Sequence, residues 1–99
     1  MDNNNVFKEL TFSENSPVKT MLLQQEHFAL VRLALGKGVK IPPHQGDHGI
    51  FFLVLQGRGN FTRGEETVEL VQNQYLNIKA NETRGIHALE DLVVFAVKM

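Results

Sequence analysis

The chain has 99 residues, of which 42% are hydrophobic and 21% charged, a composition typical of one compact globular domain. Ten basic and eleven acidic side chains leave a formal charge of −1, so no strong positive field would draw the protein to nucleic acid or to an anionic membrane. Cysteine is absent, which excludes disulfides and thiolate chemistry, and because the sequence encodes neither a leader nor an apolar span of about 18 residues, we expect a cytoplasmic protein.

The apolar residues form short runs separated by glycine, asparagine and glutamate, with turn residues recurring at intervals of about eight to twelve positions. No stretch has the length and periodicity of a long helix. This spacing is typical of an all-β sandwich or barrel, so we expect residues 1–99 to form one antiparallel all-β domain. The expected strands, in chain order, are Val6–Phe12, Val18–Gln24, Phe28–Leu35, Gly49–Gln56, Gly59–Arg63, Thr67–Val71, Tyr75–Ile78, Gly85–Leu89 and Leu92–Lys98.

Glycine and proline divide the expected strands. Glycines in the segments 36–38, 57–59 and 63–64 stand where hairpin turns require a positive φ angle. Pro42-Pro43 cannot donate hydrogen bonds to a sheet and favours an extended path. We therefore interpret it as a stiff lead, ending at His44, into the strand that follows.

Two expected strands, Gly49–Gln56 and Leu92–Lys98, are apolar on both faces. One face of each must fill the barrel, whereas the other needs a second sheet layer or a second subunit as cover, because bare apolar strands promote association. We therefore predict a homodimer.

From Gly38 onward the chain resembles the cupin superfamily. The first cupin motif is commonly written G(X)5HXH(X)3EX6G, and Gly38, His44 and Gly57 fall in register with it without a gap. In that family the two histidines and the glutamate point into the barrel as metal ligands. Here Gly46 occupies the second histidine position and Ile50 the glutamate position. The resemblance thus implies that the fold is kept while two ligands of this motif are replaced.

The second cupin motif, G(X)5PXG(X)2H(X)3N, aligns with residues 73–91. In that alignment Asn73 takes the glycine position, Lys79 the proline position and Arg84 the position of the histidine ligand. The segment also resembles the end of small cupins, in which a histidine precedes Ala-Leu-Glu-Asp, as His87 does here. Together, the motif regions 38–57 and 73–91 imply a jelly-roll-like cupin barrel, the double-stranded β-helix.

The resemblance also implies a divalent metal ion, but the standard positions offer only His44 as a ligand, and a metal needs three or more neutral or anionic donors. Arg84 adds a permanent positive charge that repels a cation. We therefore predict no metal. The alternative is a rebuilt site that holds iron, manganese, nickel or zinc on His44, His48 and His87. Strand alternation puts His44 and His48 on one face, whereas His87 reaches the interior only if the backbone near Arg84 is bulged.

Arg84 is either a solvated loop residue or an inward-facing one. If it faces inward, a planar cationic group lies among apolar walls, which suits a carboxylate or other small anion with a hydrophobic body. The candidate ligand pocket then consists of His44, His48, Ile50, Phe52 and Arg84, with Val54 and either Phe61 or Phe95 as further walls.

These residues are compatible with three functions. The first is a metal-independent module that binds or senses a small organic ligand. The second is a metal-dependent cupin enzyme of the dioxygenase or isomerase type that uses the three-histidine site. The third is an interaction unit whose barrel is filled by its own side chains. No serine or threonine lies in a recognisable nucleophile context, so catalytic residues remain unassigned and hydrolysis is not indicated.

Overall fold

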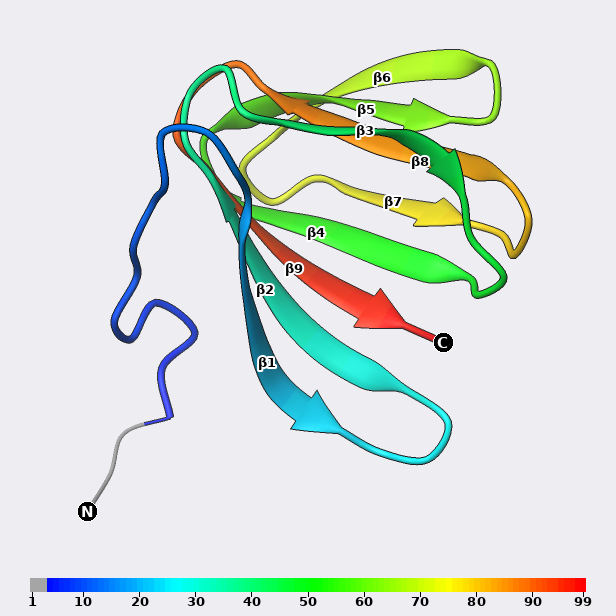
Figure 1. Cartoon of the computed structure of the whole chain (residues 1–99), viewed down its shortest axis with the longest axis horizontal. Coiled ribbons are helices and arrows are strands. Elements are labelled where there is room, and N and C mark those ends of the chain that lie inside the picture. The colour runs from blue at the N-terminus through cyan, green and yellow to red at the C-terminus, as the bar shows by residue number, and fades with distance from the viewer. Residues whose placement is uncertain (1–3) are drawn as a thin grey trace.

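The computed structural model describes residues 4–99, which form nine β-strands in two antiparallel sheets (Figure 1). The five-stranded sheet has the order β1-β2-β9-β4-β7, and the four-stranded sheet has the order β3-β8-β5-β6. Within the described residues, no helix has the length and hydropathy needed to cross a membrane. The strands are β1 (Val18–Gln24), β2 (Ala29–Leu35), β3 (Lys40–Gln45), β4 (Ile50–Gln56), β5 (Arg58–Arg63), β6 (Glu66–Val71), β7 (Tyr75–Ile78), β8 (Thr83–Ala88) and β9 (Leu92–Lys98).

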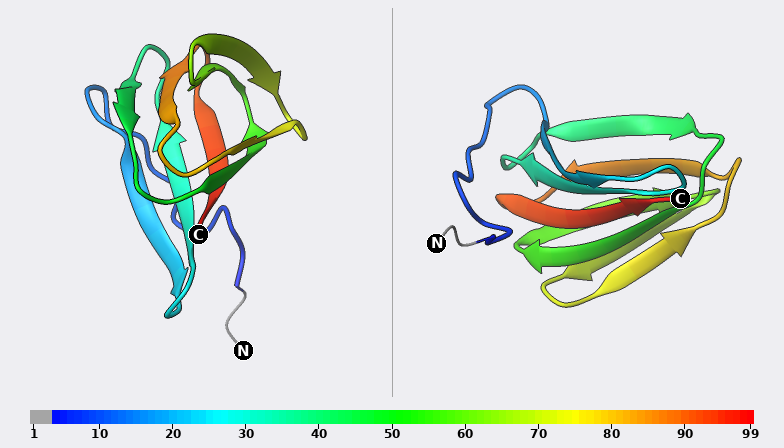
Figure 2. Two further views of the ribbon diagram at one scale, coloured as in Figure 1. Left: turned by 90° about the vertical axis from the view of Figure 1, so that its right-hand side faces the viewer. Right: turned by 90° about the horizontal axis from the view of Figure 1, so that it is seen from below.

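The two sheets face each other around one hydrophobic core (Figure 2). Successive residues of a strand point to opposite faces, so Ile50, Phe52 and Val54 of β4 are buried in the core, while Phe51 and Leu53 between them are only half-buried on the outer face. In Figure 1 the sheets converge near the β2–β3 and β8–β9 turns and diverge toward the β3–β4 connection. The core residues are Val31, Leu33, Leu35, Val39, Ile50, Phe52, Val54, Phe61, Leu70, Leu76, Ile78, Ile86, Ala88, Leu92, Val94 and Ala96.

The four glycine positions of the two cupin motifs all have a left-handed backbone. Gly38 and Gly57 of the first motif have φ angles of 87° and 85°. Asn73 of the second motif has a φ angle of 73°, and Asn81, where the motif spacing places another glycine, has one of 70°. Asparagine is among the few residues with a side chain that adopt this conformation readily. The motif alignment therefore reflects positions at which the backbone requires glycine or a close substitute.

The expected strand Val6–Phe12 is wrong, because this segment begins with a turn and continues as irregular chain. Asn5 builds the turn: its carbonyl accepts a hydrogen bond from the Lys8 amide at 2.9 Å, and its side-chain Oδ1 accepts one from the Phe7 amide at 2.8 Å. Asparagine favours such local bonds over strand pairing. The segment runs outside the barrel, near β1 (Figure 1).

The interpretation of Pro42-Pro43 as only a stiff lead into the next strand is also wrong, because both prolines lie within β3, a strand that the sequence pattern did not predict. This strand is at the edge of its sheet, and among the strands of residues 4–99 it pairs only with β8. The pairing is irregular between Ile41 and His44, which is where the prolines lie. An edge strand tolerates proline because one side of it needs no backbone donors.

Arg32 of β2 ties the N-terminal segment to the outer face of the five-stranded sheet. The residue is only 3% exposed, and its Nη1 donates to the carbonyls of Val6 at 3.0 Å and Lys8 at 2.7 Å. Its Nη2 donates to the hydroxyl of Thr20 at 3.2 Å, while its buried Nε has no acceptor within the described chain. The segment before β1 is thus held by one side chain that sequence reasoning did not identify.

We expect Arg32→Met to release this segment and to lower the free energy of unfolding by about 2 kcal/mol. The variant loses the hydrogen bonds of the charged group, and removal of the unpartnered Nε offsets part of that loss. Chymotrypsin should then cleave at Phe7 or Phe12 faster than in the wild-type protein. Arg58→Met, which removes an exposed arginine, serves as the control. An unchanged cleavage rate in Arg32→Met would contradict the role given to Arg32.

Candidate ligand cavity

A cavity of about 520 Å³ lies between the diverging ends of the two sheets. This volume falls in the range of roughly 300–1,000 Å³ that small-molecule sites occupy. The interaction-unit hypothesis requires a barrel that is filled by its own side chains. The end of the barrel at which the sheets diverge instead contains this cavity. All five residues predicted to form a pocket line it, and the complete lining is Lys19, Met21, Val31, Leu33, Ile41, His44, Gln45, Gly46, Asp47, His48, Ile50, Phe52, Arg84, Gly85, Ile86, Ala96 and Lys98.

Arg84 faces this cavity and is only 7% exposed. Its Nε donates to the carbonyl of Glu82 at 3.2 Å, and its Nη2 donates to the carbonyl of Lys79 at 3.0 Å. Within residues 4–99 its Nη1 makes no hydrogen bond, and no carboxylate forms an ion pair with the guanidinium. Two backbone carbonyls thus orient the side chain, while one donor group of a buried cation is left for a molecule in the cavity.

Gly46 provides the space that this guanidinium occupies. A Cβ atom at position 46 would lie 3.1 Å from both Cζ and Nη1 of Arg84 and 3.3 Å from its Nε. The carbonyl of Gly46 accepts a hydrogen bond from the Asn81 amide at 2.8 Å, which holds the β3–β4 connection against the β7–β8 turn. Gly46 stands at the second histidine position of the first cupin motif, and Arg84 stands at the histidine position of the second motif. The glycine therefore makes room for the arginine.

The two histidines at the cavity reach it from different kinds of structure. His44 lies in β3, and its ring Nδ1 is 3.0 Å from the carbonyl of Pro42; because a carbonyl only accepts, Nδ1 carries the proton in this hydrogen bond. His48 lies in the connection between β3 and β4, not in a strand. Strand alternation therefore does not apply to it, and its neighbour Asp47 lines the cavity as well.

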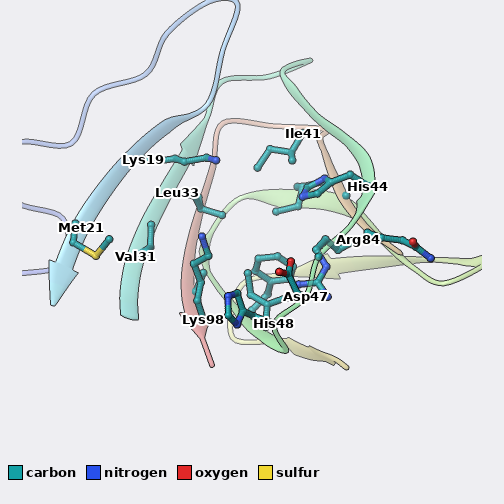
Figure 3. Close-up of a pocket in the computed structure, with 17 residues that line it drawn as sticks. Lys19, Met21, Val31, Leu33, Ile41, His44, Asp47, His48, Arg84 and Lys98 are labelled. Carbon is teal, nitrogen blue, oxygen red and sulfur yellow. The ribbon is translucent and has the colours of Figure 1, made fainter. Parts of the chain in front are cut away.

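The sequence reasoning found only part of the cavity wall. Val54 and Phe61 lie deeper in the core, and Phe95 lies on the opposite face of its strand from Ala96, which does line the cavity. It missed two lysines, Lys19 of β1 and Lys98 of β9, which are labelled in Figure 3. Alternation along β9, where Lys98 follows the core residue Ala96 by two positions, is a signal that places Lys98 on the inner face.

His87 lies away from the cavity. Strand β8 begins at Thr83, two residues before its expected start, so Arg84 and Ile86 share the inner face and His87 faces outward. There it lines a groove of about 260 Å³ on the outside of the four-stranded sheet, together with Lys40 and Asn60.

The proposed set of metal ligands is consequently not assembled. His44 and His48 line the cavity, whereas His87 belongs to the outer groove. In the described part of the chain, no three histidine, aspartate or glutamate side chains lie close enough to hold a metal ion. The residues present at the cavity do not fit the divalent metal that the cupin resemblance implies.

Comparisons with known proteins agree with the architecture. No protein-family model and no curated protein sequence matches the chain. Among solved structures, it is similar to an RmlC-like cupin from Desulfovibrio desulfuricans, with 21% identity and a TM-score of 0.87 over 99% of this chain and 95% of that one. It is also similar to the SPY1581 protein of unknown function from Streptococcus pyogenes, with 19% identity and a TM-score of 0.85 over 96% of this chain and 83% of that one.

A third similar structure is a protein with a double-stranded β-helix domain from Klebsiella pneumoniae, with 18% identity and a TM-score of 0.85 over 95% of this chain and 85% of that one. At these identities the likeness establishes the fold. The chain is an all-β protein of the double-stranded β-helix class. Within that class it has the fold of the small, RmlC-like cupins, as the motif alignment predicted.

Proposed function

We propose that this protein is a metal-independent module that binds or senses a small organic anion. The carboxylate or similar negative group of this ligand contacts Arg84, and its hydrophobic body packs against the cavity walls. The observation that supports this most strongly is the guanidinium of Arg84, which is buried, fixed by two backbone carbonyls and left with Nη1 without an acceptor among residues 4–99. A fold shared by many activities adds no preference for one ligand.

The energetics of burial favour an anionic ligand. A buried charge without a counter-charge is costly, and hydrogen bonds from a guanidinium to a carboxylate are roughly twice as strong as those between neutral groups. Leu33, Ile50 and Phe52 offer apolar surface beside this charge, and burial there stabilises a hydrophobic body by about 25 cal/mol per Å². A carboxylate with an aliphatic or aromatic body satisfies both requirements.

The test is a binding titration of chelator-treated protein with small carboxylic acids, each paired with the neutral primary amide of the same skeleton. The backbone amide NMR signals of residues 44–50 and 83–86 should shift with the acid and not with its amide. Addition of zinc, manganese or iron should leave the affinity unchanged. A metal requirement for binding, or stoichiometric metal in protein purified without chelator or nickel resin, would reject the metal-independent proposal.

We further propose that the protein is a homodimer that pairs through the outer face of the five-stranded sheet. Arg32 holds Val6 and Lys8 against this face, and Val93 is fully buried although it does not belong to the core. The face continues over the half-buried side chains of Leu53 and Phe95 to the stacked rings of Phe51 and Tyr75, of which Tyr75 is 66% exposed. Apolar patches of this kind are typical of protein interfaces.

Leu53→Arg should convert the dimer to a monomer, because it places a charge in the centre of this face, where a partner would have to desolvate it. Size-exclusion chromatography with light scattering measures the change. The matched control is Val71→Arg, which introduces the same charge at a 39% exposed apolar residue of β6 in the other sheet. A monomeric wild-type protein at micromolar concentration would refute the proposal.

A further inference from the structure

We infer that the anion taken by this cavity is a dianion, with two negative groups separated by an apolar spacer. This inference rests on the proposed function, since it assumes that one negative group binds Arg84. It adds a second binding position at Lys19 and Lys98, which lie on the five-stranded sheet, opposite Arg84 and His44 of the four-stranded sheet (Figure 3).

Strand pairing places both lysines on the inner face of the sheet. Lys19 of β1 pairs with Leu33 of β2, and Lys98 of β9 pairs with Ile50 of β4. Directly paired residues share a face, and both Leu33 and Ile50 belong to the core. Because β1 and β9 are the two neighbours of β2, the lysines approach the cavity from either side of that strand.

The charges that line the cavity are not balanced. Arg84, Lys19 and Lys98 are cationic, and Asp47 is the acidic residue among the lining side chains. Within the described chain neither lysine forms an ion pair with a carboxylate. A single carboxylate at Arg84 would leave the lysines without a counter-charge, whereas a second negative group on the same ligand would neutralise this excess.

The wall between the two positions is apolar, which determines what joins the negative groups. Val31 and Leu33 project from β2, Ile50 and Phe52 from β4, and Ala96 from β9. Polar substituents along the spacer would lose hydrogen bonds to water against these side chains without regaining them. The chemical class that fits is therefore a dicarboxylic acid with a terminal carboxylate at each end of an aliphatic or aromatic spacer.

The experiment compares linear dicarboxylic acids of about four to eight carbons, a size suited to a small-molecule cavity, with monocarboxylic acids of equal length by calorimetric titration. The best diacid should bind about five- to tenfold more tightly than its monoacid, because exposed lysines contribute modestly to each ion pair. This advantage should shrink at high salt, which screens exposed charges.

The double variant Lys19→Met/Lys98→Met should bind diacid and monoacid with equal affinity, because it removes the second binding position. The control, Lys37→Met/Lys40→Met, loses the same charge away from the cavity and should keep the preference for the diacid. If monoacids and diacids bind the wild-type protein equally well, and both lose affinity in Arg84→Met, this inference is overturned and the proposed function stands. Failure of every acid to bind would overturn the proposed function together with it.

Discussion

Arg84→Met is expected to abolish the binding of carboxylates by this protein. Methionine preserves most of the volume and apolar contact of the side chain but removes the Nη1 donor and the buried charge. Loss of one partner of a buried, hydrogen-bonded charge pair typically costs about 2–5 kcal/mol, which corresponds to a loss of affinity of roughly 30- to several-thousand-fold. The same calorimetric titration measures the loss, and circular dichroism verifies that the variant is folded.

Two further variants separate the role of the charge from that of the geometry. Arg84→Lys keeps the charge but loses the planar set of donors that reaches Lys79 and Glu82, so binding should be weakened and not abolished. Arg58→Met removes an exposed arginine whose hydrogen bond with the Glu90 carboxylate raises its pKa, and it should bind like the wild type. Wild-type affinity in Arg84→Met would exclude Arg84 as the anion-binding group.

Gly57→Ala should cause the largest loss of stability among single glycine substitutions in this protein. Gly57 has a φ angle of 85°, which is strained for alanine, and an added Cβ would overlap the carbonyl oxygen of Asp91 and lie 3.1 Å from the Cα of Leu92. Both contacts are with backbone, which cannot move aside without displacing the start of β9. We expect a loss of more than about 4 kcal/mol in the free energy of unfolding, measured by urea denaturation.

Gly38→Ala is the matched control, because Gly38 has nearly the same φ angle, 87°, but an added Cβ would have no atom within 4 Å. Only backbone strain remains there, so the expected loss is about 1–2 kcal/mol. The difference between the two variants isolates the clash at Asp91. Equal losses in both would contradict the close packing of the β4–β5 turn against the β8–β9 turn.

Strand positions and turn residues were largely predictable because they depend on local properties of the chain. Short apolar runs bounded by turn residues located eight of the nine strands to within about two residues. Gly38 and Gly57 were identified because glycine is the residue that adopts a positive φ angle without strain, and both have one. The motif spacing then linked these local features to the cupin fold, which the similar structures confirm.

Other features depended on contacts between distant parts of the chain, which no local pattern encodes. Val6–Phe12 has the composition of a strand, but Arg32 holds the start of this segment against the outer face of the sheet. Its hydrogen bonds reach the carbonyls of Val6 and Lys8, which lie 26 and 24 residues earlier in the chain. The prolines lie within a strand because β3 is an edge strand, and edge position is a property of the complete sheet.

The cavity shows the same division. Residue types and spacing were enough to nominate His44, His48, Ile50, Phe52 and Arg84, all of which line it. Arg84 faces the cavity because β8 begins at Thr83, so that Arg84 lies within the strand on the same face as Ile86. His87 then lies on the opposite face, away from His44 and His48. Lys19 and Lys98 face the same space only because β1 and β9 both pair with β2. Alternation along a strand is a local property of the backbone, whereas the choice of neighbouring strands is made by the packing of the whole barrel.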